Sequence, residues 1–446
     1  MKVNVRVRGL LVRALVLLAV LAVLTVFINL SWFDEPLHPD LAALSTPQPV
    51  SMEGNAYTLI HGLPAADDRD PRAAGEAIVR ALRERYRQGE RIALSTDELN
   101  DILGGSNLDQ AWQAEFQSLT CNARTSLDCA DRLIVEAGQG HGDHPRLRLL
   151  LERYDAILRE SRFEEIQEAD VYSPVPGYGL LMTVGRMRLA MSYQRAPTAE
   201  FLAEVGEDSR FWRTMLRDGQ SLIAKMVALA GLRNDLEFLS ALMRERELNN
   251  DEIEVMRSVL QPLTRQEQDI GEAFLAELRI VQLSYKPLVV ALGDSSWVTG
   301  LTLQENATLN EYYLTAIMPT LLRASLSADE FYRRHGYERP AYTLRAFPPP
   351  LFNLGGKLVL KTQTPGYQDY ISRVHDLGGR MSLVLLQAEI EQSPEQPAHS
   401  VIQSSKHRNP YTLAPMEYDP QAQTIAFECL SNPNDVCGAA IGRSAR

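Results

Sequence analysis

Four cysteines are the residues whose spacing says most about chemistry. Cys121 and Cys129 are separated by seven residues, and Cys429 and Cys437 repeat that spacing. Each gap is short and rich in turn-forming residues, so we expect each pair to close its own small disulfide loop. Because four cysteines allow three connectivities, the long-range pairings remain alternatives. Disulfides persist outside the cytosol, so the pattern predicts an oxidising compartment.

A metal site is the alternative use of these and other ligands. Paired zinc ligands usually stand about two to four residues apart, a spacing that the cysteine pairs do not have. His141-Gly142-Asp143-His144 brings two imidazoles and a carboxylate within four residues, as zinc or copper would require. Asp143 and His144 also stand just before Pro145, and either is the expected N-cap of the next helix. We expect this capping role, no bound metal and no cofactor, with His141, Asp143 and His144 as the alternative ligands.

Sequence signatures of common catalytic sites are absent. The chain has no G-x-S-x-G elbow, no H-E-x-x-H, no Walker loop and no dinucleotide fingerprint, and none of its six lysines follows a serine by three residues. His375-Asp376, and Glu330 with His335, pair an acid with an imidazole, but on or beside amphipathic helices we expect solvated or capping roles. Lys225 lies in an apolar run, where we expect it to be ion-paired or to extend toward solvent.

One segment near the N-terminus is long and apolar enough to span a membrane. Ala14 to Phe33 holds twenty residues without an ionisable side chain. At about 1.5 Å per residue it covers the roughly 30 Å hydrocarbon core, which a signal-peptide core of about 7–15 residues does not. Four basic residues precede it, Lys2, Arg6, Arg8 and Arg13, and none follows it directly, so we expect a cytoplasmic N-terminus. Asp34 and Glu35 begin the acidic far side. A cleaved signal peptide is the alternative, although no small-x-small site follows the run.

The charge of the chain limits its partners. The net charge is −12, and because four basic groups precede the apolar segment, the remaining chain carries 41 basic against 57 acidic residues. A negative field repels polyanions, so nucleic acid is excluded as a partner. The expected partners are the lipid bilayer, through one transmembrane helix, and another protein of the cell envelope.

The sequence predicts a mainly α fold: a transmembrane helix, then an α-helical bundle or irregular array of helical hairpins, with a small C-terminal β-hairpin. The expected regions are a cytoplasmic basic segment (1–13), a transmembrane anchor (14–33), a proline-containing spacer (34–51), a helical periplasmic domain (52–338) and a C-terminal helix plus β-hairpin region (339–446).

Local patterns place individual elements. Apolar helices are expected over Tyr178–Tyr193 and Phe211–Leu232, which we assign to the inner core. Four matches to the capping box predict helix starts. They are Ser95-x-x-Glu98, Thr264-x-x-Glu267, Thr308-x-x-Glu311 and Ser327-x-x-Glu330. Alternation over 412–418 and 424–428 predicts the hairpin that leads into Cys429.

The chain resembles uncharacterised membrane-anchored periplasmic proteins of Gram-negative bacteria. The resemblance rests on the anchor, the helix from Phe211-Trp212-Arg213 to Leu232, and the segment Asn409-Pro410-Tyr411-Thr412…Pro415-Met416-x-Tyr418-Asp419. These motifs are structural, so the resemblance implies an inner-membrane anchor and a periplasmic body and assigns no catalytic residue.

Three functional hypotheses follow from these features. The first is a non-enzymatic envelope interaction or scaffold protein. The second is a periplasmic hydrolase that acts on an envelope substrate through a site assembled only in the fold. The third is a sensor that binds a small molecule between the long helices.

Overall fold

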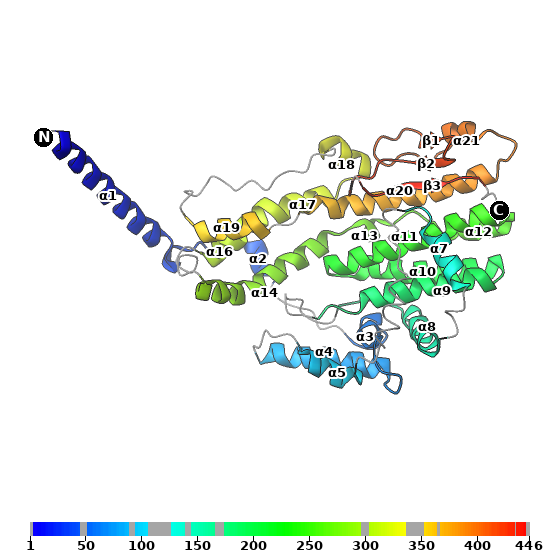
Figure 1. Ribbon diagram of the computed structural model, residues 1–446, viewed down its shortest axis with the longest axis horizontal. Helices are drawn as coiled ribbons and strands as arrows, with labels where there is room; N and C mark the ends of the chain where they lie inside the picture. The colour runs from blue at the N-terminus through cyan, green and yellow to red at the C-terminus, as the bar shows by residue number, and fades with distance from the viewer. Residues whose placement is uncertain are drawn as a thin grey trace. The chain divides into compact units, whose positions relative to one another are not determined.

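The chain is mainly helical and ends in a small antiparallel sheet, as the sequence predicts (Figure 1). The computed structural model describes residues 3–44, 51–88, 94–105, 126–138, 144–165, 174–295, 303–335, 352–363, 366–432 and 434–442.

Two compact units are built from interleaved stretches of the chain. The first comprises Met1–Pro47, Glu277–Leu322 and Pro340–Gly366, and the second comprises Gln48–Ala276, Arg323–Arg339 and Tyr367–Arg446. This grouping differs from the linear division expected from the sequence. That division places a helical domain over 52–338 and a separate region over 339–446. The physical reason is that helix α20 (Gln368–Glu391) packs along α11 (Leu222–Glu245), so the C-terminal region completes the core of the helical body.

Unit 2 is a bundle in which long helices surround α11. Helices α10 (Thr198–Asp218), α9 (Tyr178–Arg195), α7 (Cys129–Ala137) and α20 all pack on it. The other described helices of this unit are α3 (Ala56–Gly62), α4 (Pro71–Arg87), α5 (Thr96–Leu103), α8 (Pro145–Leu158), α12 (Asn250–Val259), α13 (Arg265–Gln268), α18 (Ala328–His335) and α21 (Ala398–Ser404). The predicted core helix over 178–193 is therefore confirmed as α9.

The predicted single helix over Phe211–Leu232 is wrong, because the chain breaks after Asp218. Ser221 begins α11 as its N-cap, with its side chain accepting from the Ala224 amide. Lys225 closes the turn between the two helices: its ammonium donates to the carbonyl oxygens of Leu216 at 2.5 Å and Arg217 at 3.1 Å. A lysine in an apolar run is explained by this role, since the last carbonyls of α10 lack partners within their own helix.

A buried carboxylate ties three helices of unit 2 together. Asp208 on α10 accepts from the Tyr154 hydroxyl of α8 at 2.7 Å and from the Trp212 indole at 2.6 Å. Asp235 on α11 is hydrogen-bonded to Asp208 and accepts from Ser209 at 2.7 Å. Burial raises the pKa of both carboxyls. Because Asp208 has the larger number of donors, we place the shared proton on Asp235.

The C-terminal segment of unit 2 is a small sheet. β1 (Glu417–Asp419) pairs with β2 (Thr424–Ala426), which confirms the predicted hairpin. β3 (Gly438–Ala440) adds an antiparallel strand to the other edge of β2. Sequence reasoning misses β3 because Gly-Ala-Ala has neither alternation nor β-branched residues.

Unit 1 contains the apolar helix α1 (Val3–Ile28) and a cluster of helices at its C-terminal end (Figure 1). The cluster consists of η1 (Ser31–Phe33), α2 (Pro39–Ala43), α16 (Glu305–Tyr312), the π-helical turn η3 (Tyr313–Ile317), α17 (Met318–Ala324), which runs on into unit 2, and α19 (Leu354–Gln363). Helix α14 (Gly271–Ser295) also crosses the boundary between the units. The expected spacer over 34–51 is structured where it is described, since Tyr313 donates to Asp40 of α2 at 2.7 Å.

Two adjacent glycines of α20 test the packing of unit 2. A Cβ on Gly379 would lie 2.4 Å from the Phe427 ring, whereas a Cβ on Gly378 would meet nothing within 4 Å. Gly379→Ala should lower the free energy of unfolding by about 1–3 kcal/mol through overpacking. Gly378→Ala should leave it unchanged or raise it by up to about 1 kcal/mol, because alanine favours helix. Urea unfolding of the full chain measures both, and equal effects would contradict the packing described.

Candidate functional site

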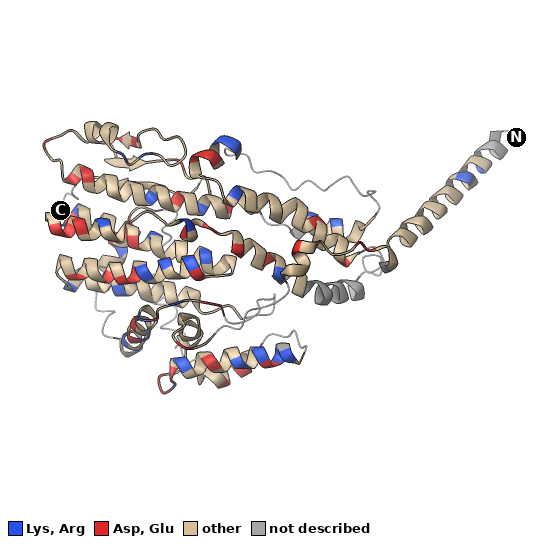
Figure 2. Ribbon diagram, turned by 180° about the vertical axis from the view of Figure 1, so that it is seen from behind, with Lys and Arg blue, Asp and Glu red and all other residues tan. Residues whose placement is uncertain are grey.

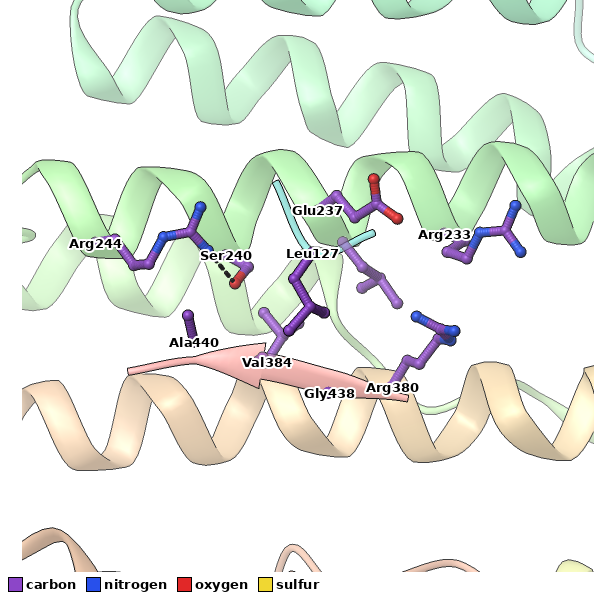
Figure 3. Close-up of a pocket in the computed structure, with 11 residues that line it drawn as sticks. Leu127, Arg233, Glu237, Ser240, Arg244, Arg380, Val384, Gly438 and Ala440 are labelled. Carbon is purple, nitrogen blue, oxygen red and sulfur yellow. Dashed lines mark hydrogen bonds between the residues drawn. The ribbon is translucent and has the colours of Figure 1, made fainter. Parts of the chain in front are cut away.

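An ionic cavity lies between α11, α20 and β3 of unit 2 (Figure 3). Its volume is about 30 Å³, which holds one or two waters and is far below the roughly 300 Å³ of a typical small-molecule site. The lining residues are Leu127, Arg233, Leu236, Glu237, Ser240, Arg244, Arg380, Val384 and Gly438–Ala440.

Helical spacing places the polar residues of this cavity. Arg233, Glu237, Ser240 and Arg244 recur at four, three and four residues along α11, which sets them on one face. Arg380 reaches toward them from α20 (Figure 3). The spacing was visible in the sequence as charged positions on a largely apolar helix. The sequence does not indicate that Arg380 joins them, because only the fold brings α20 to α11.

A hydrogen-bonded chain fixes one end of the cavity. Arg244 Nη2 donates to both carboxylate oxygens of Asp131 on α7, at 2.6 and 2.5 Å. Its Nη1 donates to the Ser240 hydroxyl at 3.3 Å, and that hydroxyl donates to Gln387 Oε1 at 2.8 Å. Gln387 Nε2 returns a bond to the Ser240 carbonyl oxygen at 3.1 Å. These contacts hold α7, α11 and α20 in register.

Glu237 is the titratable group of the cavity. Its Oε1 is enclosed and has no hydrogen-bond partner among the described residues. Burial raises the pKa of Glu237 to about 7, an effect that attraction to Arg233, Arg380 and Arg186 opposes. A carboxyl with this pKa exchanges its proton near neutral pH. The cavity can therefore hold an ordered water or a small anion and change its charge with pH.

A second candidate region, the anchor junction, lies in unit 1 where α1 ends. It comprises Asn29, Asp34, Gln304, Asn310 and Asn353. Asn29 is 3% exposed, and its Oδ1 accepts from the backbone amide of Asn353 at 2.7 Å. The side chain of Gln304 donates to the carbonyl oxygens of Asn29 and Leu30. The polar end of the apolar helix is thus bonded to two segments distant in sequence.

Helix α16 is held to the same segment. Asp34 accepts from the amides of Asn306 and Ala307 at 2.9 and 3.0 Å, so it satisfies the N-terminus of α16 in place of a local cap. Asn310 accepts from the His38 amide at 2.8 Å and donates to Glu35 and to the Pro36 carbonyl oxygen, each at 2.9 Å. Sequence reasoning missed the junction, although an asparagine at the end of the apolar run was a visible signal.

Of the candidate metal ligands, only His144 belongs to the described residues. It is the N-cap of α8, and its Nδ1 accepts from the Arg146 amide at 3.2 Å. This confirms the capping role expected from the proline that follows. His141 and Asp143 lie outside the described residues.

The second cysteine pair forms the predicted local disulfide. Cys429 and Cys437 are bonded, with their Cα atoms 5.5 Å apart. Asp376 of α20 lies close to both sulfurs, but a disulfide has no thiolate to offer a metal. Its carboxylate instead accepts from Tyr411 at 2.5 Å and from the amides of Leu430 and Ser431 at 3.1 and 3.0 Å. Cys121 lies outside the described residues, so its pairing with Cys129 stays a prediction.

The neighbouring His375 takes no part in that network. Its ring packs 5.4 Å from Phe331, and burial lowers its pKa to about 4. Adjacent residues on a helix diverge by about 100°, which separates His375 from the direction of Asp376. The other acid–imidazole pairing involves His335, whose side chain is not among those described.

Comparison with protein-family models, with curated proteins and with solved structures found no match for this chain.

The raised pKa of Glu237 makes stability depend on pH. Between about pH 4.5 and 7 the folded state keeps a proton that the unfolded state has lost, so the free energy of unfolding falls as pH rises through this window. Glu237→Gln removes this pH dependence. The change that it causes in the free energy of unfolding should be about 3 kcal/mol more stabilising above pH 7 than below pH 4.5. Urea unfolding across pH 4–8 measures the difference between variant and native protein.

The matched control is Glu254→Gln, which removes an exposed carboxylate from α12. A difference between Glu237→Gln and native protein that does not vary with pH would contradict an enclosed carboxyl at this position.

Proposed function

We propose that this protein is anchored in a bacterial inner membrane by α1, with its body in the periplasm, and serves as a non-enzymatic envelope interaction or scaffold protein. The observation that carries the proposal is the anchor junction. It makes the end of the apolar helix a structural part of unit 1.

The first support is the surface of α1. The stretch Arg8–Ile28 has a mean hydropathy of 2.8, and none of it is buried within the protein. Leu10, Leu15 and Val23 are each more than 60% exposed. Charged residues of α1 are confined to its beginning (Figure 2). Transfer of such a surface out of water is favourable at about 25 cal/mol per Å², and a bilayer provides the apolar surroundings.

The second support concerns cleavage. A signal peptidase that cut beyond the apolar run would remove Asn29 and leave the side chain of Gln304 and the amide of Asn353 without these partners. An unsatisfied buried polar group costs about 1–3 kcal/mol. Retention of α1 is therefore favoured over its removal, and the junction supports an anchor.

The third support concerns catalysis. Groups that could have formed an acid–base site have structural partners: His144 caps α8, Lys225 caps α10, and Asp376 holds the cysteine loop. Binding of a partner by the helical body needs none of these groups. This distribution favours an interaction role for unit 2.

The raised pKa of Glu237 is the observation in favour of the alternative function, a periplasmic hydrolase. A carboxyl with a pKa of about 7 suits a general acid or base at neutral pH, and Ser240 lines the same cavity. The volume of about 30 Å³ argues against a substrate there, and Ser240 already bonds to Gln387. We therefore rank the interaction role first.

Topology is the first test. In intact cells the full chain should stay in the membrane fraction after an alkaline wash, because α1 is held by the bilayer. Its intact mass should retain Met1 or the residue after it. Cys429 and Cys437 should resist alkylation until reduced, as expected of a disulfide in an oxidising compartment. A mature chain that begins beyond Asn29 would turn the anchor into a signal peptide and refute this part of the proposal.

Partner binding is the second test. A photo-crosslinking residue placed at Val135 or at Leu413, which are 60% and 62% exposed, should give a discrete adduct with an envelope protein in intact cells. The same residue at the exposed polar position Glu395 is the control. Absence of specific adducts from both apolar positions would count against the interaction role.

A further inference from the structure

The start of α19 is fixed to the end of α1 within unit 1. Asn353, the residue before α19, has φ of 51° and is 1% exposed. Its amide donates to Asn29, while its side-chain oxygen accepts from the Gln304 amide at 3.0 Å and the Thr308 hydroxyl at 3.1 Å. An asparagine tolerates this left-handed conformation better than most residues. The first residue of α19 therefore lies one peptide from the last turn of α1.

Close packing against α16 fixes α19 a second time. A Cβ on Gly356 would lie 2.0 Å from the Thr308 hydroxyl, so only glycine allows this approach. Asp34, which follows the apolar helix, satisfies the N-terminus of α16. The bonds of Asn353 and the packing of Gly356 on α16 thus both fix α19 to the segment that follows α1.

Helix α19 has an apolar exposed side. Leu354 and Leu358, one turn apart, are 43% and 63% exposed, whereas Gly356 and Leu360 are buried. At the end of α1, Trp32 and Phe33 are 85% and 46% exposed. We call these four residues, Trp32, Phe33, Leu354 and Leu358, the interfacial patch.

The charge of α19 suits an anionic surface. Its ten residues include two of the six lysines of the chain and no carboxylate. Lys361 is exposed, whereas Lys357 is buried at 5% exposure and does not reach the surface. The whole chain carries a net charge of −12, so a helix whose only exposed charge is positive departs from the general composition. Lys361 can attract an anionic headgroup, and leucines enter the boundary between headgroups and acyl chains.

The distances are compatible with the membrane surface. Leu354 is about 3.8 Å from Asn353 along the chain, and Leu358 is about 6 Å further along the helix. The headgroup region on each side of the hydrocarbon core is about 5–8 Å thick. A helix tied to the end of a membrane span can therefore reach this layer.

We propose that α19 lies on the periplasmic surface of the bilayer and that the interfacial patch inserts into its headgroup layer. The inference rests on the proposed function, because it takes α1 as the span. The occupant of the patch is phospholipid. A span together with a surface helix restricts the rotation of unit 1 about α1, which a single helix leaves free.

The experiment uses the full chain with an environment-sensitive fluorophore on one introduced cysteine, under non-reducing conditions. The protein is reconstituted in phosphatidylcholine–phosphatidylglycerol vesicles that carry a quencher near the headgroup or deep in the acyl chains. Leu358→Cys reports on α19. Leu413→Cys, which is 62% exposed in unit 2, is the matched control, and Val16→Cys reports on the span.

At Leu358 we expect a blue-shifted emission and a loss of fluorescence that is greater with the headgroup quencher than with the deep one. At Leu413 neither change is expected. Emission at Leu358 that matches Leu413 while Val16 is quenched would overturn the surface role and leave the span intact. A blue shift without lipid quenching would assign the patch to a protein contact and also overturn it. Failure of Val16 to be quenched would refute the span, and the surface role with it.

Discussion

The cost of burying a polar group without a partner is the constraint on which both units depend. In unit 1, Asn29 ends an apolar helix and is buried. Its side-chain nitrogen donates to the Thr25 carbonyl oxygen of α1, but its side-chain oxygen and its backbone carbonyl oxygen have their partners outside α1. Gln304 and Asn353 supply them from more than 270 residues away. Once these bonds form, the C-terminal end of α1 has one position relative to α16 and α19. The C-terminal end of the apolar helix is therefore part of the fold of unit 1.

Unit 2 meets the same requirement with charged groups. Lys225, Asp208 and Asp376 are each at most 4% exposed, and each is bonded to a group on another element or at a helix end. Close approach of the helices is needed for these bonds. Gly231 provides it for Asp208, because a Cβ there would lie 2.2 Å from the Trp212 ring that donates to the carboxylate. Polar partners and small residues thus specify the same packing.

Features with a local physical cause could be predicted from the sequence, and long-range partners could not. The apolar helix, the C-terminal hairpin and the local disulfide between Cys429 and Cys437 are confirmed, and each depends on residues near in sequence. The capping boxes at Ser95 and Thr264 also form. Thr308 matches the same pattern but lies inside α16, where its hydroxyl donates to the Gln304 carbonyl oxygen and to Asn353. A motif four residues long cannot distinguish these two uses.

The cavity and the anchor junction could not be predicted from the sequence for a related reason. Arg380 reaches the α11 face only because α20 returns to the helical body, and Asn353 reaches Asn29 across 324 residues. Helical periodicity carries no information about such pairings, since it describes one element at a time. The polar residue at the end of an apolar run was the available signal. An asparagine that is buried there needs hydrogen-bond partners, and in this fold Asn353 supplies one to its side chain from far along the sequence.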